Sequence, residues 1–244
     1  MTFEYFKKAC GYGSLLLVLV LSGCTHYAVS NDLVAGTQQP KNPDSILWTL
    51  DSLTRVGGFS ATAEGEPQLT KTPWGSAVYF DGDGDRLVVD GNPLGDAQAF
   101  TIEIIFNPDD AHPKNSEPRF FHIEAPGNPD RRITIELRLN DQQQWYLDAY
   151  IKSEKSQFTL IDPALVHPVG QWAHAAITFQ ERKFTSYVNG KKELEAEVDY
   201  LPIGEQGKAS IGARMNRVHW FKGAILAVRI TPSVLSAEEF FRPF

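Results

Sequence analysis

Cysteine is scarce in this sequence: the chain has two, Cys10 and Cys24, and both lie near its N-terminus. No internal disulfide framework can hold the rest of the chain, so its stability must come from a hydrophobic core. Long apolar runs are also missing. The run LLLVLVL at residues 15–21 is much shorter than the ~20 apolar residues that a membrane-spanning helix needs.

Positive charge is in the minority, with 23 lysines and arginines against 30 aspartates and glutamates and a formal net charge of −7. An acidic surface repels nucleic acid, and no basic patch interleaved with aromatic residues interrupts it. Nucleic-acid binding is therefore not expected. The motifs His-Glu-x-x-His and Gly-x-Ser-x-Gly are absent as well, so neither zinc-dependent nor serine-dependent hydrolysis is indicated.

The N-terminus has the pattern of an export signal. Two lysines precede the apolar run, and small residues follow it up to Cys24. This order is typical of a signal peptide, which we place at residues 1–23. The tetrad LSGC at residues 21–24 resembles the lipobox of bacterial lipoproteins. That resemblance implies cleavage before Cys24 and lipid on its sulfur and new amino group; an ordinary secreted protein cut nearby is the alternative.

The residue after the cysteine bears on the destination. In bacterial lipoproteins an aspartate there usually retains the protein at the inner membrane, so Thr25 favours the outer membrane of a Gram-negative cell. Several acyl chains make such an anchor durable, and it would be the only contact with the membrane. Residues 24–45 are polar, contain Pro40 and Pro43, and show no apolar period, which predicts a flexible tether.

The rest of the chain, residues 46–244, predicts a single all-β domain. Short apolar or alternating segments are separated by clusters of Gly, Asn, Asp and Pro, as in FTIEIIF, RITIELRL, WYLDAYI, WAHAAITF and AILAVRI. This pattern favours a sandwich or barrel over βαβ units. Asn189-Gly190 predicts a two-residue type I′ hairpin. Ser236 and Glu239 have the spacing of a capping box and predict one short helix near the end.

Several segments occur together in a familiar order: FDGDGDRLVV, FTIEIIF, QWAHAAITF followed by YVNGKKE, and SIGARMNRVHWFKGAILAVRI with LSAEEF. Over residues 46–244 they resemble the laminin-G-like branch of the concanavalin A-like lectin/glucanase folds. The resemblance implies a two-sheet antiparallel jelly-roll sandwich in which one curved sheet offers a concave outer face. It does not fix a function, because such sandwiches serve lectins, adhesion modules and enzymes alike.

Strand alternation predicts what that face carries. In RITIELRL and WYLDAYI the isoleucines, leucines and Trp145 point inward, and a hairpin over residues 140–144 pairs Leu139 with that tryptophan. Glu136 then lies opposite Asp148. The same alternation adds residues from two other segments, so the predicted ligand-binding residues are Glu103, His122, Glu136, Arg138, Tyr146, Asp148 and Tyr150.

The facing carboxylates of Glu136 and Asp148 are informative, because across a strand pair their Cβ atoms would be ~5 Å apart and the charges would repel. Arg138, a cation, a shared proton or open solvent must offset that cost. Such a mixture of acids, arginine and tyrosines suits a polysaccharide or glycoconjugate. The alternative is a solvated sheet face that alternates polar residues without binding anything.

Catalysis is the second functional hypothesis. Glycoside hydrolases use two carboxyl groups ~5 Å or ~6.5–9.5 Å apart, so a hydrolase or polysaccharide lyase could use Glu136 and Asp148. Glucanases of the resembling fold usually carry Glu-x-Asp-x-x-Glu on one strand, and here Arg138 stands where the middle acid belongs. Binding without catalysis is therefore favoured. A protein-interaction module without a sugar site is the third hypothesis, and His174 is expected to be a hydrogen-bonded structural residue.

The stretch YFDGDGDRLVV raises the question of calcium at Asp81, Asp83 and Asp85. An EF-hand loop needs a glycine at its sixth position and a glutamate at its twelfth, where this chain has Arg86 and Asn92. A tight turn fits better, because the intervening glycines permit positive φ and aspartates bond to their own backbone. No cofactor is expected, and calcium at the three aspartates is the alternative.

A second candidate ligand site lies in the segment GARMNRVHWFKG, which predicts a loop between two strands. Loops on a rigid scaffold often carry binding residues. A tryptophan flanked by cations would suit a carbohydrate or an acidic partner. The alternative is that Trp220 and Phe221 close one end of the core. The candidate residues are Arg214, Asn216, His219 and Trp220.

Overall fold

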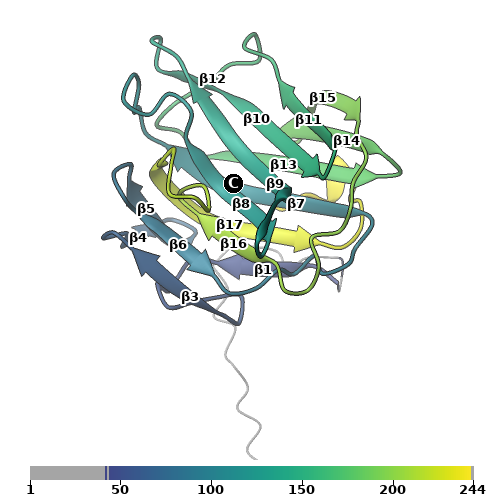
Figure 1. Cartoon of the computed structure of the whole chain (residues 1–244). Helices are drawn as coiled ribbons and strands as arrows, with labels where there is room; N and C mark the ends of the chain where they lie inside the picture. The colour runs from purple at the N-terminus through teal and green to yellow at the C-terminus, as the bar shows by residue number, and fades with distance from the viewer. Residues whose placement is uncertain (1–41, 43, 243–244) are drawn as a thin grey trace, which may run out of the picture. The chain divides into compact units, whose positions relative to one another are not determined.

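Two antiparallel sheets pack face to face in the computed structural model, which describes residue 42 and residues 44–242 (Figure 1). The predicted signal peptide, Cys24 and the tether up to residue 41 lie outside the described residues. No helix among those described is long and apolar enough to cross a membrane. The predicted all-β sandwich is confirmed.

The first sheet contains eight strands: β1 (Ile46–Thr49), β4 (Gln68–Thr72), β5 (Gly75–Asp81), β7 (Phe100–Pro108), β13 (Ala173–Gln180), β14 (Lys183–Val188), β15 (Lys191–Glu197) and β17 (Lys222–Thr231). Their order is β15-β14-β13-β7-β17-β5-β4, with β1 paired to β17. The long strands β7 and β17 are neighbours although more than a hundred residues separate them, so this sheet is held together by non-local pairing.

The second sheet contains nine strands: β2 (Arg55–Val56), β3 (Phe59–Glu64), β6 (Arg86–Val89), β8 (Arg119–Ala125), β9 (Asn128–Leu139), β10 (Gln144–Ser153), β11 (Ser156–Ile161), β12 (His167–Pro168) and β16 (Lys208–Ile211). Their order is β11-β10-β9-β8-β16-β6-β3-β2, with β12 paired to β10. We call these two layers the eight-stranded and the nine-stranded sheet.

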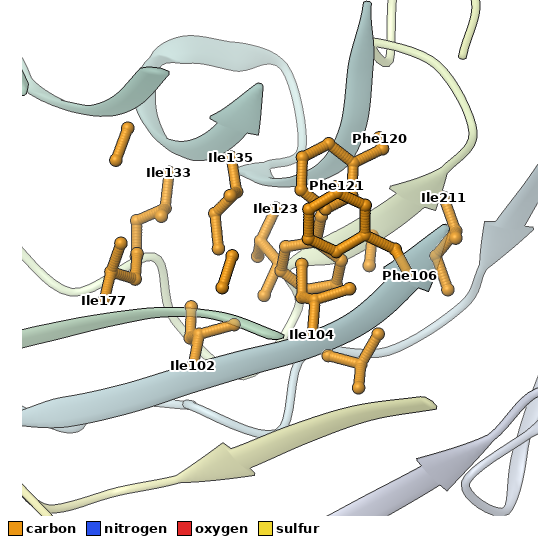
Figure 2. Close-up of a cluster of buried hydrophobic side chains, with 14 of the residues drawn as sticks. Ile102, Ile104, Phe106, Phe120, Phe121, Ile123, Ile133, Ile135, Ile177 and Ile211 are labelled. Atoms are coloured by element: carbon orange, nitrogen blue, oxygen red, sulfur yellow. The ribbon is translucent and has the colours of Figure 1, made fainter. Parts of the chain in front are cut away.

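The core between the sheets is filled by the inward side of each alternating strand. Ile102 and Ile104 of β7 face Ile133 and Ile135 of β9, and all four are fully buried (Figure 2). β-Branched side chains favour extended backbone and pack well on a pleated surface, which explains why isoleucine is so frequent here. One side of β9 therefore packs in the core, and the side chains on its other side point to the surface.

The hairpin of β9 and β10 has the predicted register. Leu139 pairs with Trp145, and Glu136 pairs with Asp148. The side-chain oxygen of Asn140 accepts a hydrogen bond from the backbone N–H of Gln144 at 3.0 Å, which closes the turn. The predicted inward and outward sides of both strands are confirmed.

The two other local predictions are also confirmed in outline. Asn189 and Gly190 have φ values of 50° and 75°, as a type I′ turn requires, and the strands they join are β14 and β15. The short C-terminal helix is a 3-10 turn, η1 (Ala237–Glu239). The backbone N–H of Ser236 donates to the Glu239 carboxylate at 2.9 Å, as the capping box predicts.

The expectation that Glu103 joins the predicted face is wrong. Its side chain does point away from the core, but β7 belongs to the eight-stranded sheet, so Glu103 lies on the opposite side of the sandwich. There it is buried and bonded to Arg229 and to Nε2 of His174. The backbone N–H of Phe241 completes the set at 2.6 Å. His174 is thus a buried, hydrogen-bonded residue, as expected.

Candidate functional site

A pocket opens on the outer face of the nine-stranded sheet, above the pairing of β9 with β10. Its volume is about 160 Å³. Pockets for drug-sized ligands measure roughly 300–1,000 Å³, so this one is smaller than such a site. We call it the arginine pocket, and it is lined by Arg119, Arg132, Glu136, Arg138, Asp148, Tyr150, Thr159 and Arg214.

Two carboxylates form the floor of the arginine pocket. Glu136 and Asp148 pair directly across β9 and β10, and their side chains are only 7% and 2% exposed. Burial raises the pKa of Glu136, and the charge of Asp148 raises it further. Burial likewise raises the pKa of Asp148. The sequence argument that this pair needs compensation therefore applies to a largely desolvated site.

Two of the arginines supply that compensation. Arg119 Nε lies 2.9 Å from Glu136 Oε2. Arg138 places Nε and Nη2 each 2.7 Å from Asp148 Oδ2, and its Nη1 reaches Glu117. Both guanidiniums oppose the rise in the carboxylate pKa values caused by burial. Each floor carboxylate thus has its own cationic partner.

The other two arginines of the pocket are not paired with a carboxylate in this way. Among the described residues, no salt bridge joins Arg132 or Arg214 to a carboxylate. Arg132 lies over the ring of Tyr150, 5.0 Å from its centroid, and donates to the carbonyl of Pro129. Burial lowers the pKa of Arg214, and the nearby charges of Arg132 and Arg119 lower it further.

The loop over residues 212–220 reaches the same pocket. The backbone N–H of Met215 donates to Nδ1 of His122 at 3.0 Å, and Arg86 donates to the carbonyl of Met215 at 2.7 Å. These bonds hold the loop across the nine-stranded sheet, so that Arg214 lines the arginine pocket. Arg214 is the one residue of the second candidate site that lines the pocket with residues of the first.

His122 lies on the predicted face but is not available to a ligand. It is fully buried beneath the loop, and its Nε2 lies 3.1 Å from Glu124. Burial lowers its pKa, although Glu124 opposes this effect. With one ring nitrogen on the backbone of Met215 and the other on Glu124, His122 positions the loop.

The remaining predicted residues lie outside the lining of the pocket. Tyr146 is half-buried and pairs with Arg138 across the strands, outside the lining of the pocket. In the loop, Asn216 is exposed, and the carbonyl of His219 accepts from the Arg119 backbone at 2.8 Å. Trp220 is half-buried, whereas its neighbour Phe221 belongs to the core.

Three lining residues were missed by the sequence reasoning. Arg132 has the same parity as Glu136 and could have been found by extending the alternation one step along β9. Thr159 pairs with Tyr150 on β11, a strand with a weak apolar pattern. Arg119 was hidden by a β-bulge at the start of β8.

At the start of β8 the alternation breaks. Arg119 pairs with Glu136, but the next pair along the strands is Phe121 with Ile135, so Phe120 is an extra residue. Phe120 uses this freedom to enter the core, where its ring lies 4.6 Å from that of Phe106 (Figure 2). The bulge thereby turns Arg119 outward onto the pocket. Alternation counted back from Phe121 without the bulge would assign Arg119 to the core.

The acidic stretch is a turn. The buried carboxylate of Asp85 accepts the backbone N–H groups of Glu66 at 2.6 Å and Asp81 at 3.0 Å, while Gly82 and Gly84 have φ values of 82° and 106°. The predicted turn geometry is confirmed. Within residues 42 and 44–242 no group of three or more His, Cys, Asp or Glu is placed to hold a metal ion. Calcium at this turn stays a prediction.

Comparisons with known proteins agree on the fold. The family model Laminin_G_3, described as the concanavalin A-like lectin/glucanases superfamily, matches residues 62–240. A search of curated proteins finds no match. Among solved structures, the chain is similar to domain 4 of AbnA, a GH43 extracellular arabinanase from Geobacillus stearothermophilus, in complex with arabinotriose. The TM-score is 0.60 at 16% identity, covering 80% of this chain and 94% of that one.

Two other solved structures have the same architecture. The binding domain of botulinum neurotoxin DC in complex with rat synaptotagmin II has a TM-score of 0.57 at 17% identity; the match covers 80% of this chain but only 50% of that one. The heptameric SAP-like pentraxin from Limulus polyphemus has a TM-score of 0.54 at 15% identity, covering 67% and 78%. At such identities these likenesses show the fold alone.

Proposed function

Since the chain belongs to the concanavalin A-like lectin/glucanases superfamily, we propose that it is a lectin-like module that binds a glycan through the arginine pocket. The observation that carries this proposal is the convergence of Glu136, Arg138, Asp148 and Tyr150 with Arg214 in one pocket. A similar domain has been solved with arabinotriose, which supports a carbohydrate ligand for this architecture. A polysaccharide or glycoconjugate is the proposed partner.

The chemistry of the pocket suits a sugar. Guanidinium and carboxylate groups bind hydroxyl groups through short, charge-assisted hydrogen bonds. The ring of Tyr150 adds an apolar surface beside them, and its hydroxyl is already oriented by a 2.8 Å bond to Gln157. Because the pocket is small, the rest of a longer glycan would lie across the face of the sheet.

The state of the two carboxylates favours binding over catalysis. A general base must be free to take a proton from its substrate. Here Arg119 holds Glu136, and Arg138 bonds twice to Asp148. The raised pKa values of this pair nevertheless make a glycoside hydrolase or polysaccharide lyase the second candidate, because perturbed acids gather at catalytic sites.

In this proposal the module is exported and held in the cell envelope by lipid on Cys24. The basic start, the apolar run and the LSGC tetrad at residues 21–24 support it. Thr25 favours the outer membrane. The polar residues that follow would hold the domain away from the lipid surface.

Calorimetric titration of the full-length protein, purified in mild detergent, against a panel of polysaccharide fragments tests the proposal. We expect saturable binding that Glu136→Gln weakens and that the exposed control Glu197→Gln leaves unchanged. Release of smaller sugars by the wild type, lost in Glu136→Gln, would instead support the enzyme. Absence of binding to every glycan would leave a protein-interaction module as the better explanation.

A further inference from the structure

We propose that the arginine pocket is specific for sugars that carry a carboxylate, such as uronic acids. This inference rests on the proposed glycan binding and concerns the chemical class of the ligand. It depends on Arg132 and Arg214, which come from different elements and line the same small pocket. A carboxylate that entered the pocket would meet both guanidiniums.

The charges of the lining are unequal. Four arginines face two carboxylates, and Arg119 and Arg138 already pair with those two. The two acids nearest the rim are also engaged, because Glu117 is bonded to Arg138 and Glu124 lies 3.1 Å from Nε2 of His122. Neither rim acid lines the pocket. Glu124 pairs with Arg132 across β8 and β9 and interacts with both remaining guanidiniums, but it lies outside the pocket lining, so inside the pocket the arginines outnumber the acids.

The pKa of Arg214 reflects this excess of positive charge. Its side chain is partly buried, and the cations Arg132 and Arg119 lower its pKa more than the acids Glu136 and Glu124 raise it. A desolvated cation without a counter-charge costs free energy, which an incoming anion recovers. A neutral sugar offers hydroxyl groups but no charge, so it would leave that cost in place.

The guanidinium of Arg132 and the backbone that carries Arg214 are held in position before any ligand arrives. Tyr150 supports Arg132 from below, and the carbonyl of Pro129 accepts from it. The loop that carries Arg214 is fixed by Arg86 and by His122. Guanidinium groups match the planar carboxylate, with two parallel N–H donors each.

The test compares oligosaccharides that differ only in charge. Oligomers of galacturonate, glucuronate and mannuronate are titrated into the full-length protein in mild detergent, alongside the same oligomers reduced at the carboxyl to neutral hexoses. We expect at least one uronate series to bind about tenfold or more tightly than its neutral counterpart, since one charge-assisted hydrogen bond contributes this much. Its affinity should also fall as salt rises.

Two variants and one control assign the effect to the pocket. Arg132→Gln and Arg214→Gln should each reduce affinity for the uronate about tenfold and reduce affinity for the neutral oligomer by a smaller factor, because a hydroxyl group loses one hydrogen bond where a carboxylate also loses its charge partner. Arg131→Gln is the matched control, because it removes the same charge from the next residue, whose partner is Glu154 on the surface. Unchanged thermal unfolding of all three variants would show that each remains folded.

The outcomes separate this inference from the proposed function. Equal affinity for the uronate and its neutral counterpart would overturn the inference and leave glycan binding intact. Preference for a sulfated oligosaccharide over all uronates would overturn the carboxylate assignment. Absence of binding to charged and neutral oligomers alike would overturn both. A uronate preference that Arg131→Gln removes as fully as Arg214→Gln would refute the assignment to the pocket.

Discussion

Replacing Arg119 by methionine tests the electrostatics of the pocket most directly. The side chain of Arg119 is 11% exposed, and that of its partner Glu136 is 7% exposed. Removing one member of a buried ion pair costs ~3–5 kcal/mol, because the other charge is left desolvated. Arg138 still lies close to Glu136, so we expect the low end, about 3 kcal/mol. For a domain of this size that corresponds to a fall in Tm of roughly 6–12 °C.

The loss should depend on pH in a definite direction. Burial already raises the pKa of Glu136 in the folded state, and removing Arg119 raises it further above the unfolded value of ~4.3. An acid whose folded pKa is raised contributes stability that is complete below the unfolded pKa and is lost as pH rises through the folded pKa. The free energy of unfolding of Arg119→Met should therefore be close to that of the wild type near pH 4 and furthest below it at neutral pH.

Urea unfolding followed by tryptophan fluorescence measures this across the pH range. The double variant Arg119→Met/Glu136→Gln is the control, because it removes the stranded charge together with its partner. We expect it to recover most of the loss at neutral pH, with an unchanged slope of free energy against urea. A loss of the same size at pH 4 and pH 7 would refute the reasoning, as would a double variant no more stable than Arg119→Met.

Three further predictions concern the acidic turn and the anchor. Asp85→Ala removes two buried hydrogen bonds to backbone N–H groups and should cost about 3 kcal/mol in urea unfolding, whereas Asp83→Ala, whose partner Lys114 is exposed, should change stability by less than ~0.5 kcal/mol. Comparable costs for both would contradict the turn. EDTA should leave Tm unchanged, since the Asp85 carboxylate already binds backbone; a fall of several degrees would instead demonstrate a resident cation. Metabolic labelling with a fatty-acid analogue should mark the wild type and not Cys24→Ala, and equal labelling would exclude the anchor.

The sequence predicted the register of the site because its signal is local. In β9 and β10 every second residue is apolar, and the intervening hairpin is short, so only one pairing buries both apolar sides. That arrangement sets Glu136 opposite Asp148. The same reasoning applies to the Asn189-Gly190 turn, where the backbone conformation follows from two adjacent residues.

Other features of the site depend on contacts that alternation does not encode. Parity put Glu103 on the outside of its strand but could not say which sheet that strand joins, because β7 pairs with β13 and β17 from distant parts of the chain. The bulge at Phe120 places its ring in the core against Phe106, a contact between distant strands. The loop that carries Arg214 is drawn over the sheet by His122, nearly a hundred residues earlier. Each of these depends on tertiary packing.

The last few described residues cover the buried cluster around Glu103. The backbone N–H of Phe241 donates to the Glu103 carboxylate, and Arg229, which pairs with that carboxylate, donates to the carbonyl of Glu239 in η1. A polypeptide that ended before Phe240 would leave the buried carboxylate of Glu103 without this backbone donor on the outer face of the eight-stranded sheet.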